Sequence, residues 1–325
     1  MYLKYQNCFV ISVQISKLLY TKEKNEFKTG VLLTTYFVDL LRMKEKTDPI
    51  LVLKSNGEKA PFEKDKFLNA LRYSGASKHE SYQILQQVES KLFDGIPTKK
   101  IYKLAYSLLK KKKSHGTAGR YRLKKAIFEL GPSGYAFELF VSRLFESLGY
   151  SVKTDQLING KCILHEVDVL AKKSNLIVFV ECKFRSDYRG KTDVKVPLYI
   201  HSRFSDIESK WREVPANENM EMNGFVVTNA RFTKDAIEYA ECAGLGLISW
   251  DYPAESSLKY YIDKSGMHPI TSLNGLTKVQ KSAMLKEGVV LCRELAKSKF
   301  LLEKLGLNEK QINKVLTEAQ HIINH

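Results

Sequence analysis

The sequence predicts a multidomain protein in which two mixed α and β regions precede a helical C-terminal region. The chain has 325 residues, which exceeds the usual size of a single domain. Two pairs of short apolar segments, within residues 50–62 and 165–183, each flank a polar break, and this pattern is typical of a β-hairpin. From about residue 256 onward, apolar residues recur at helical spacing instead.

The second hairpin carries the residues with the clearest chemistry. Alternation along its first strand places Asp168 on the face opposite Val167 and Val169, and on its second strand Glu181 and Lys183 share a face. Pairing the two strands brings Asp168, Glu181 and Lys183 to one end. A carboxylate-held Mg²⁺ can neutralise a phosphodiester and produce a nucleophile from water, while a lysine can hold that water. The alternative is that these are solvated residues that close an ordinary hairpin.

A family resemblance supports the catalytic interpretation. Asp168, the thirteen-residue step to Glu181 and the triplet Glu181-Cys182-Lys183 resemble the signature of PD-(D/E)xK nucleases. The helix opened by residues 134–138 and the strand and turn at residues 224–233 resemble the Mrr-type restriction endonuclease branch. The likeness covers about residues 131–253. It implies an α/β restriction endonuclease-like domain with a mixed sheet, acting on double-stranded DNA.

The same resemblance implies roles for individual residues. It implies four catalytic residues: Glu138, Asp168, Glu181 and Lys183. Asp168, Glu181 and the backbone carbonyl of Cys182 would ligate Mg²⁺ or Mn²⁺, Glu138 would complete the shell, and Lys183 would orient the attacking water. For Glu138, an ordinary first-turn carboxylate favoured by the helix dipole is the alternative.

The first hairpin opens a different module. Its strands are expected at residues 50–53 and 59–62, and helices follow at residues 63–74, at residues 78–93 and from Thr98. This small hairpin plus helical bundle resembles the ATP-cone, the regulatory nucleotide-binding domain of ribonucleotide reductases and their repressors. The matching residues are Val52, Lys54, Gly57, Phe62, Lys66, Asp94, Gly95, Ile96, Thr98, Ile101 and Tyr102.

By this resemblance, ATP or dATP is the regulatory ligand, and Val52, Lys54, Lys66 and Thr98 contact it. Lysines suit phosphates, and a helix start offers free backbone amides. Without the resemblance, the lysines read as solvated side chains and Thr98 as a helix cap. The chain has no Gly-x-x-x-x-Gly-Lys-Ser/Thr motif, so hydrolysis-driven translocation is not indicated.

Charge points to a polyanionic partner. The chain has 52 Lys and Arg against 36 Asp and Glu, a net charge of +16. Such an excess favours nucleic acid, although charge alone does not separate DNA from an anionic membrane surface. Residues 110–125 hold eight cations, expected as a loop followed by a basic helix. We interpret this run as a track for DNA phosphates, with a solvated face as the alternative.

Composition also indicates the cellular compartment in which the protein is expected. The five cysteines are odd in number and widely spaced, so they predict neither a disulfide framework nor a zinc knuckle and fit a reducing cytoplasm. No apolar run reaches the length of a membrane span, and the N-terminus lacks the organisation of a signal peptide. The expected protein is cytoplasmic, without a membrane partner.

We divide the chain into four parts. Residues 1–48 are expected to be an upstream extension without function, with Met43 as the alternative native start; residues 49–130 form the ATP-cone and residues 131–254 the nuclease domain. Residues 255–325 form a helical region that binds DNA, caps the fold or mediates homo-oligomerisation.

The sequence therefore predicts a metal-dependent DNA endonuclease regulated by ATP or dATP. A non-catalytic alternative is a nucleotide-responsive DNA-binding regulator or junction-binding protein, in which the nuclease fold supplies only a basic groove. A third class is an assembly protein that uses the cone for oligomerisation. The carboxylates favour catalysis, because a pure binder has no chemical need for acids facing a DNA phosphate.

Overall fold

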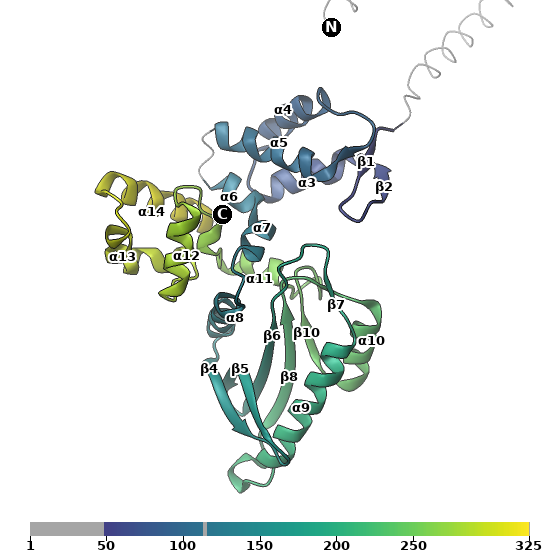
Figure 1. The fold of residues 1–325 in the computed structure, drawn as a ribbon, viewed down its shortest axis with the longest axis vertical. Coiled ribbons are helices and arrows are strands. Elements are labelled where there is room, and N and C mark those ends of the chain that lie inside the picture. Colours follow the sequence, from purple (N-terminus) through teal and green to yellow (C-terminus); the bar gives the residue numbers. More distant parts are fainter. Residues whose placement is uncertain (1–48, 113–115, 325) are drawn as a thin grey trace, which may run out of the picture. The chain divides into compact units, whose positions relative to one another are not determined.

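The computed structural model describes residues 49–112 and 116–324 (Figure 1). Ile50–His325 forms one compact unit. The predicted N-terminal extension and the alternative start at Met43 lie outside the described residues.

The N-terminal region of this unit is a small sheet with three helices. Strand β1 (Leu51–Leu53) pairs antiparallel with β2 (Lys59–Pro61) and parallel with β3 (Ile96–Pro97). Helices α3 (Lys64–Tyr73), α4 (Lys78–Glu89) and α5 (Thr98–Lys111) bury an apolar core against it. The Ser77 side chain caps α4 by accepting a hydrogen bond from the Glu80 amide. The hairpin and three helices are confirmed, whereas β3 was not predicted because two residues carry no periodicity.

The basic run differs from the expected single loop and helix. Lys110 and Lys111 end α5, and two short helices follow, α6 (Thr117–Tyr121) and α7 (Leu123–Phe128). Arg120 Nε donates to the Ser74 carbonyl at 2.9 Å, and Arg122 pairs with the Glu129 carboxylate. Their side chains are engaged within the protein, so the continuous phosphate track expected here is wrong at these two positions.

A five-stranded mixed sheet forms the centre of the next region. Its strand order is β10-β8-β6-β5-β4, in which β10, β8 and β6 are parallel and β6, β5 and β4 are antiparallel. The strands are β4 (Ser151–Asn159), β5 (Leu164–Lys173), β6 (Leu176–Lys183), β8 (Glu221–Thr228) and β10 (Gly246–Ile248). The predicted hairpin is confirmed as β5 and β6. Strand β4 was not predicted, although its partly buried residues Val152, Thr154 and Gln156 alternate with exposed ones.

Helices cover both faces of this sheet. Helix α8 (Tyr135–Ser147) buries Phe137, Phe140 and Leu144 against one face. Helices α9 (Lys195–Trp211) and α10 (Lys234–Ala243) cover the other, where Phe204 and Ala240 belong to a separate core. Short strands β7 (Lys191–Thr192) and β9 (Arg231–Phe232) pair in parallel nearby, and a 3₁₀ turn η1 spans Pro215–Asn217. The expected mixed sheet in an α/β region is confirmed.

The C-terminal region is helical, as predicted. It contains α11 (Leu258–Ser265), η2 (Ile270–Ser272), α12 (Lys278–Lys286), η3 (Cys292–Ser298), α13 (Lys299–Lys304) and α14 (Glu309–Ile323). Its apolar residues share one core with α7 and α8, so it is packed as an integral part of the unit. No helix among the described residues is long and apolar enough to cross a membrane.

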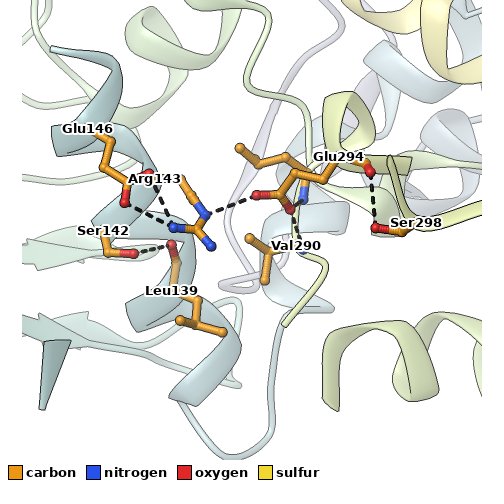
Figure 2. A network of polar contacts seen from close by, with 8 residues as sticks. Leu139, Ser142, Arg143, Glu146, Val290, Glu294 and Ser298 are labelled. Carbon is orange, nitrogen blue, oxygen red and sulfur yellow. Dashed lines mark hydrogen bonds and ion pairs between the residues drawn. The ribbon is translucent and has the colours of Figure 1, made fainter. Parts of the chain in front are cut away.

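Polar contacts fix this region at two further points. Arg143 of α8 donates from Nε to Glu294 Oε1 of η3 at 3.0 Å, while Glu294 Oε2 accepts from the amides of Val290 and Leu291 (Figure 2). Tyr106 of α5 donates its hydroxyl proton to Asn274, which is itself held by Glu318 of α14. The C-terminal region therefore contacts both helix α8, which precedes the sheet, and helix α5 of the N-terminal region.

Candidate functional site

The candidate site lies where the β5–β6 ladder ends. The last ladder pairs join Leu170 to Phe179 and Val169 to Val180. Asp168 and Glu181 follow these pairs on the two strands, and the Cys182 amide donates to Asp168 Oδ2 at 2.6 Å. A side chain thus replaces the backbone ladder at this point. This arrangement brings the two predicted carboxylates together, as the sequence pattern indicated.

The strand is distorted at Asp168, and the alternation expected there is wrong. Val167 packs with the core under α9 and α10, whereas Val169 packs with the core under α8. Strict alternation would put both on one face. On the neighbouring strand, Asp155 has a φ of 52° at the same level, a left-handed conformation that re-aims a strand. Asp168 therefore projects from a kink, where both faces of the sheet are within reach.

Carboxylates crowd around this kink. Burial raises the pKa of Glu138 in the first turn of α8 to about 7, with the charges of Asp168, Asp155, Glu166 and Glu181 adding to the effect. Burial, with the charge of Asp168 acting in the same direction, also raises the pKa of Glu181 to about 7. The pKa of Asp168 is likewise raised, first by burial, against the Cys182 amide that lowers it. Because like charges repel, five neighbouring carboxyl groups disfavour each other's ionised form unless a cation binds among them.

Two cations of the protein lie beside these acids. Arg203 of α9 donates from one guanidinium nitrogen to Glu181 Oε2 at 2.8 Å and from the other to the Glu166 carbonyl. Lys183 is exposed at the end of β6, and its charge lowers the pKa of Glu181. The role of Arg203 was missed, although it directly precedes Phe204 of the buried stripe on α9. Asp155 was missed together with its strand, β4.

The oxygen donors suit a hard cation. One oxygen of each central carboxylate, Asp168 Oδ2 and Glu181 Oε2, is held by a hydrogen bond from the protein. Mg²⁺ binds one or two protein carboxylates and keeps several waters, so two such acids match its preferred ligands in type and number. Within residues 49–112 and 116–324, no three or more His, Cys, Asp or Glu side chains are grouped to hold a metal by themselves. The Cys182 thiol is buried and its pKa is raised, so only the backbone carbonyl of that residue suits Mg²⁺.

The residues assigned to the nucleotide lie in and around β1. Thr98 is the first residue of α5, and the parallel pairing of Leu53 with Pro97 places the next residues, Lys54 and Thr98, at the same end of the two strands. Lys54 pairs with Glu58 at 3.1 Å. The Val52 side chain is buried in the core, and its strand pairs with β2 on one side and β3 on the other.

Lys66 lies apart from this strand end. It is in the first turn of α3, where its exposed side chain approaches Glu63 at 3.6 Å. Exposed pairs of this kind contribute little to stability, which leaves both lysines available to an anion.

Comparison with known proteins defines two parts of the chain. Residues 50–127 match the family model of the ATP cone domain, and residues 268–323 match the model described as AF1548-like, C-terminal. The chain therefore contains an ATP cone, which implies a nucleotide ligand and a nucleotide-regulated function. The two matches leave residues 128–267 uncovered, so the interpretation of the sheet region rests on its own residues.

One relative in Archaeoglobus fulgidus is an uncharacterized protein, 29% identical over 184 residues, which are 56% of this chain and 99% of that protein. The crystal structure of a protein of unknown function, AF1548, is also 29% identical; the match covers 59% of this chain and 98% of that one, with a TM-score of 0.49. The MspJI restriction endonuclease in complex with a 27-mer oligonucleotide is 14% identical over 55% of this chain and 37% of that one, with a TM-score of 0.30.

Proposed function

We propose that the protein is a metal-dependent DNA endonuclease of the PD-(D/E)xK class, regulated by ATP or dATP bound to its ATP cone. The single observation that carries this proposal is the pair formed by Asp168 and Glu181 at the end of the β5–β6 ladder, with Lys183 beside it. In this proposal residues 49–130 are the regulatory domain, residues 131–254 the Mrr-type nuclease domain and residues 255–325 a helical region.

The residues have complementary tasks in this reaction. Asp168, Glu181 and the Cys182 carbonyl would hold Mg²⁺ or Mn²⁺, which supplies charge neutralisation at the phosphate and an acidified water. Lys183 orients the attacking water toward the phosphorus. Glu138, with a pKa of about 7, can accept the proton of that water at its carboxylate. The water oxygen forms a bond to phosphorus as the bond to the leaving sugar oxygen breaks, and solvent protonates that oxygen.

Cleavage of supercoiled plasmid tests the proposal. Wild type is compared with Asp168→Ala and Lys183→Ala in Mg²⁺ or Mn²⁺, with and without ATP or dATP, on modified and unmodified DNA. Lys172→Ala is the matched control, because Lys172 is an exposed lysine on the same hairpin at its opposite end. We expect both site variants to abolish metal-dependent cutting and the control to retain it.

A second function is favoured by one observation. Arg203 already neutralises Glu181 at 2.8 Å, and a protein that only bound DNA could keep its acids paired in this way. In that case the chain is a nucleotide-responsive DNA-binding regulator. DNA binding by wild type without cutting under any metal or nucleotide condition would establish this alternative in place of the nuclease.

A further inference from the structure

The Arg203 side chain joins two strands at the candidate site. One guanidinium nitrogen donates to Glu181 Oε2 on β6 at 2.8 Å, and the other donates to the Glu166 carbonyl on β5. The Arg203 and Glu181 side chains are 13% and 14% exposed, so the pair is largely removed from water. The guanidinium also lies 5.6 Å from the centre of the Tyr199 ring. These contacts restrain the arginine on three sides.

The position of this bridge is specific. The β5–β6 ladder stops at Val169 and Val180, and Glu166 and Glu181 lie beyond that pair. One planar guanidinium thus spans the two strands where backbone pairing is lost. A lysine has a single ammonium on a flexible stem and does not present two donors in a fixed fork. The geometry therefore uses a property that only arginine has.

We infer that Arg203 is a positioning residue that fixes the Glu181 carboxylate through Oε2 and leaves Oε1 directed to the metal beside Asp168. This inference rests on the proposed metal-dependent nuclease function. It assigns Arg203 to the metal site rather than to the DNA backbone, because its donors are committed to Glu181 and Glu166 and its side chain is mostly buried. A carboxylate held by a protein donor is restricted in rotation, so it binds a cation with less loss of conformational freedom.

Metal binding without DNA is the measurement that tests this role. Mn²⁺ is titrated calorimetrically into full-length wild type, Arg203→Lys and Arg203→Gln, and thermal unfolding of each metal-free protein verifies its fold. Arg212→Lys is the matched control, since Arg212 caps the C-terminal end of the same helix and pairs with Glu208 at the surface. Asp168→Asn, which removes a central carboxylate ligand, shows the calorimetric signal expected when the Mn²⁺ site is lost.

We expect both Arg203 variants to bind Mn²⁺ about 10- to 100-fold more weakly than wild type, the usual loss when a residue that orients a metal ligand is replaced. Arg212→Lys should bind as wild type does. In plasmid cleavage, the Mg²⁺ concentration for half-maximal rate should rise in the Arg203 variants by a similar factor, with a smaller change in the rate at saturating Mg²⁺.

Three outcomes would overturn the inference. Wild-type Mn²⁺ affinity in Arg203→Lys would mean that charge alone matters and that the fork positions nothing. Unchanged affinity in both variants with a lower unfolding temperature would make Arg203 a structural clip, and weaker DNA binding in metal-free protein with unchanged Mn²⁺ affinity would make it a phosphate contact. In each of these cases wild type still binds metal and cuts, so the proposed function stands; a wild type that neither binds Mn²⁺ nor cuts DNA removes both.

Discussion

Arg143 and Glu294 join helix α8 to the C-terminal region through a 3.0 Å hydrogen bond between Nε and Oε1 (Figure 2). Helix α8 also carries Glu138, about 1.4 turns before Arg143, so the position of a candidate catalytic acid depends on residues more than a hundred positions away in the chain. Glu294 also accepts two backbone amides through its other oxygen. Removal of the Glu294 side chain should therefore lower the free energy of unfolding by a different amount from removal of the Arg143 side chain.

Glu294→Ala should destabilise the protein more than Arg143→Ala. The glutamate variant leaves the Val290 and Leu291 amides without their acceptor, at a cost of about 1–3 kcal/mol in the free energy of unfolding. The arginine variant loses two partly exposed ion pairs, with Glu294 and with Glu146, at a cost of about 0–1 kcal/mol for each, and it leaves no buried amide without an acceptor. Urea unfolding of both variants and of Glu294→Gln, which keeps an acceptor oxygen, measures the difference. Equal losses for the two alanine variants would contradict this account.

Stability without metal should fall as pH rises through the neutral range. The pKa of Glu138 is raised from 4.5 to about 7, so between these values the folded protein binds more protons than the unfolded chain. The contribution of Glu138 to stability is complete below about pH 4.5 and is lost as pH rises through about 7. Glu181, with the same direction of shift, adds to this slope.

Glu138→Gln should therefore stabilise the metal-free protein at pH 8, by on the order of 1 kcal/mol after allowance for its partial exposure to solvent. Its stability should also vary less between pH 5 and pH 8 in the range where Glu138 titrates. Thermal unfolding across pH measures both effects, and Glu238→Gln on the exposed face of α10 is the control. A destabilised Glu138→Gln protein at pH 8 would show that the acid is favourably paired instead.

Adenine nucleotide should stabilise the protein through its ATP cone. A ligand that binds only the folded state adds about 2.7 kcal/mol at a concentration one hundred times its Kd. We expect Lys54→Met and Thr98→Val to weaken ATP binding by about tenfold each, the loss of roughly one charged hydrogen bond of 1.4 kcal/mol. Lys103→Met, an exposed lysine further along α5, should bind as wild type does. Calorimetric titration of ATP and dATP measures these affinities, and unchanged binding in Lys54→Met would remove that residue from the site.

The Tyr106 hydroxyl should carry part of the effect of nucleotide on the rest of the protein. It links α5, which begins at Thr98, to Asn274 and through it to Glu318. Tyr106→Phe keeps the ring and removes the hydroxyl, which bonds to Asn274 and also to Arg122. We expect ATP affinity to be little changed, while the ATP-dependent change in cleavage rate falls by about 1 kcal/mol or less in coupling free energy. Tyr82→Phe, an exposed tyrosine on α4, is the control; full retention of the ATP effect in Tyr106→Phe would exclude this link.

Local pattern was sufficient for much of the architecture. The β5–β6 hairpin, helices α3, α4, α5 and α8 and the helical C-terminal region follow from apolar periodicity and turn residues, which depend on near neighbours in the chain. The ATP cone was predicted from residues such as Lys54 and Thr98 in a short, ordered motif, and the family match at residues 50–127 confirms it. The meeting of Asp168 with Glu181 was also predictable, because a tight hairpin sets its own register.

Tertiary structure alone decided the remaining features. Arg203 reaches Glu181 only because Phe204 of α9 stacks on Phe179 of the sheet, a contact that no local spacing encodes. The kink at Asp168 arises opposite Asp155 on β4, a strand paired from outside the hairpin. Arg120 and Arg122 carry the same charge as any phosphate-binding arginine, and only the carbonyl and carboxylate that the fold places beside them direct them inward. The residue types present establish which groups are available for chemistry, whereas long-range packing establishes which of them meet, because burial and charge pairing depend on segments distant in the chain.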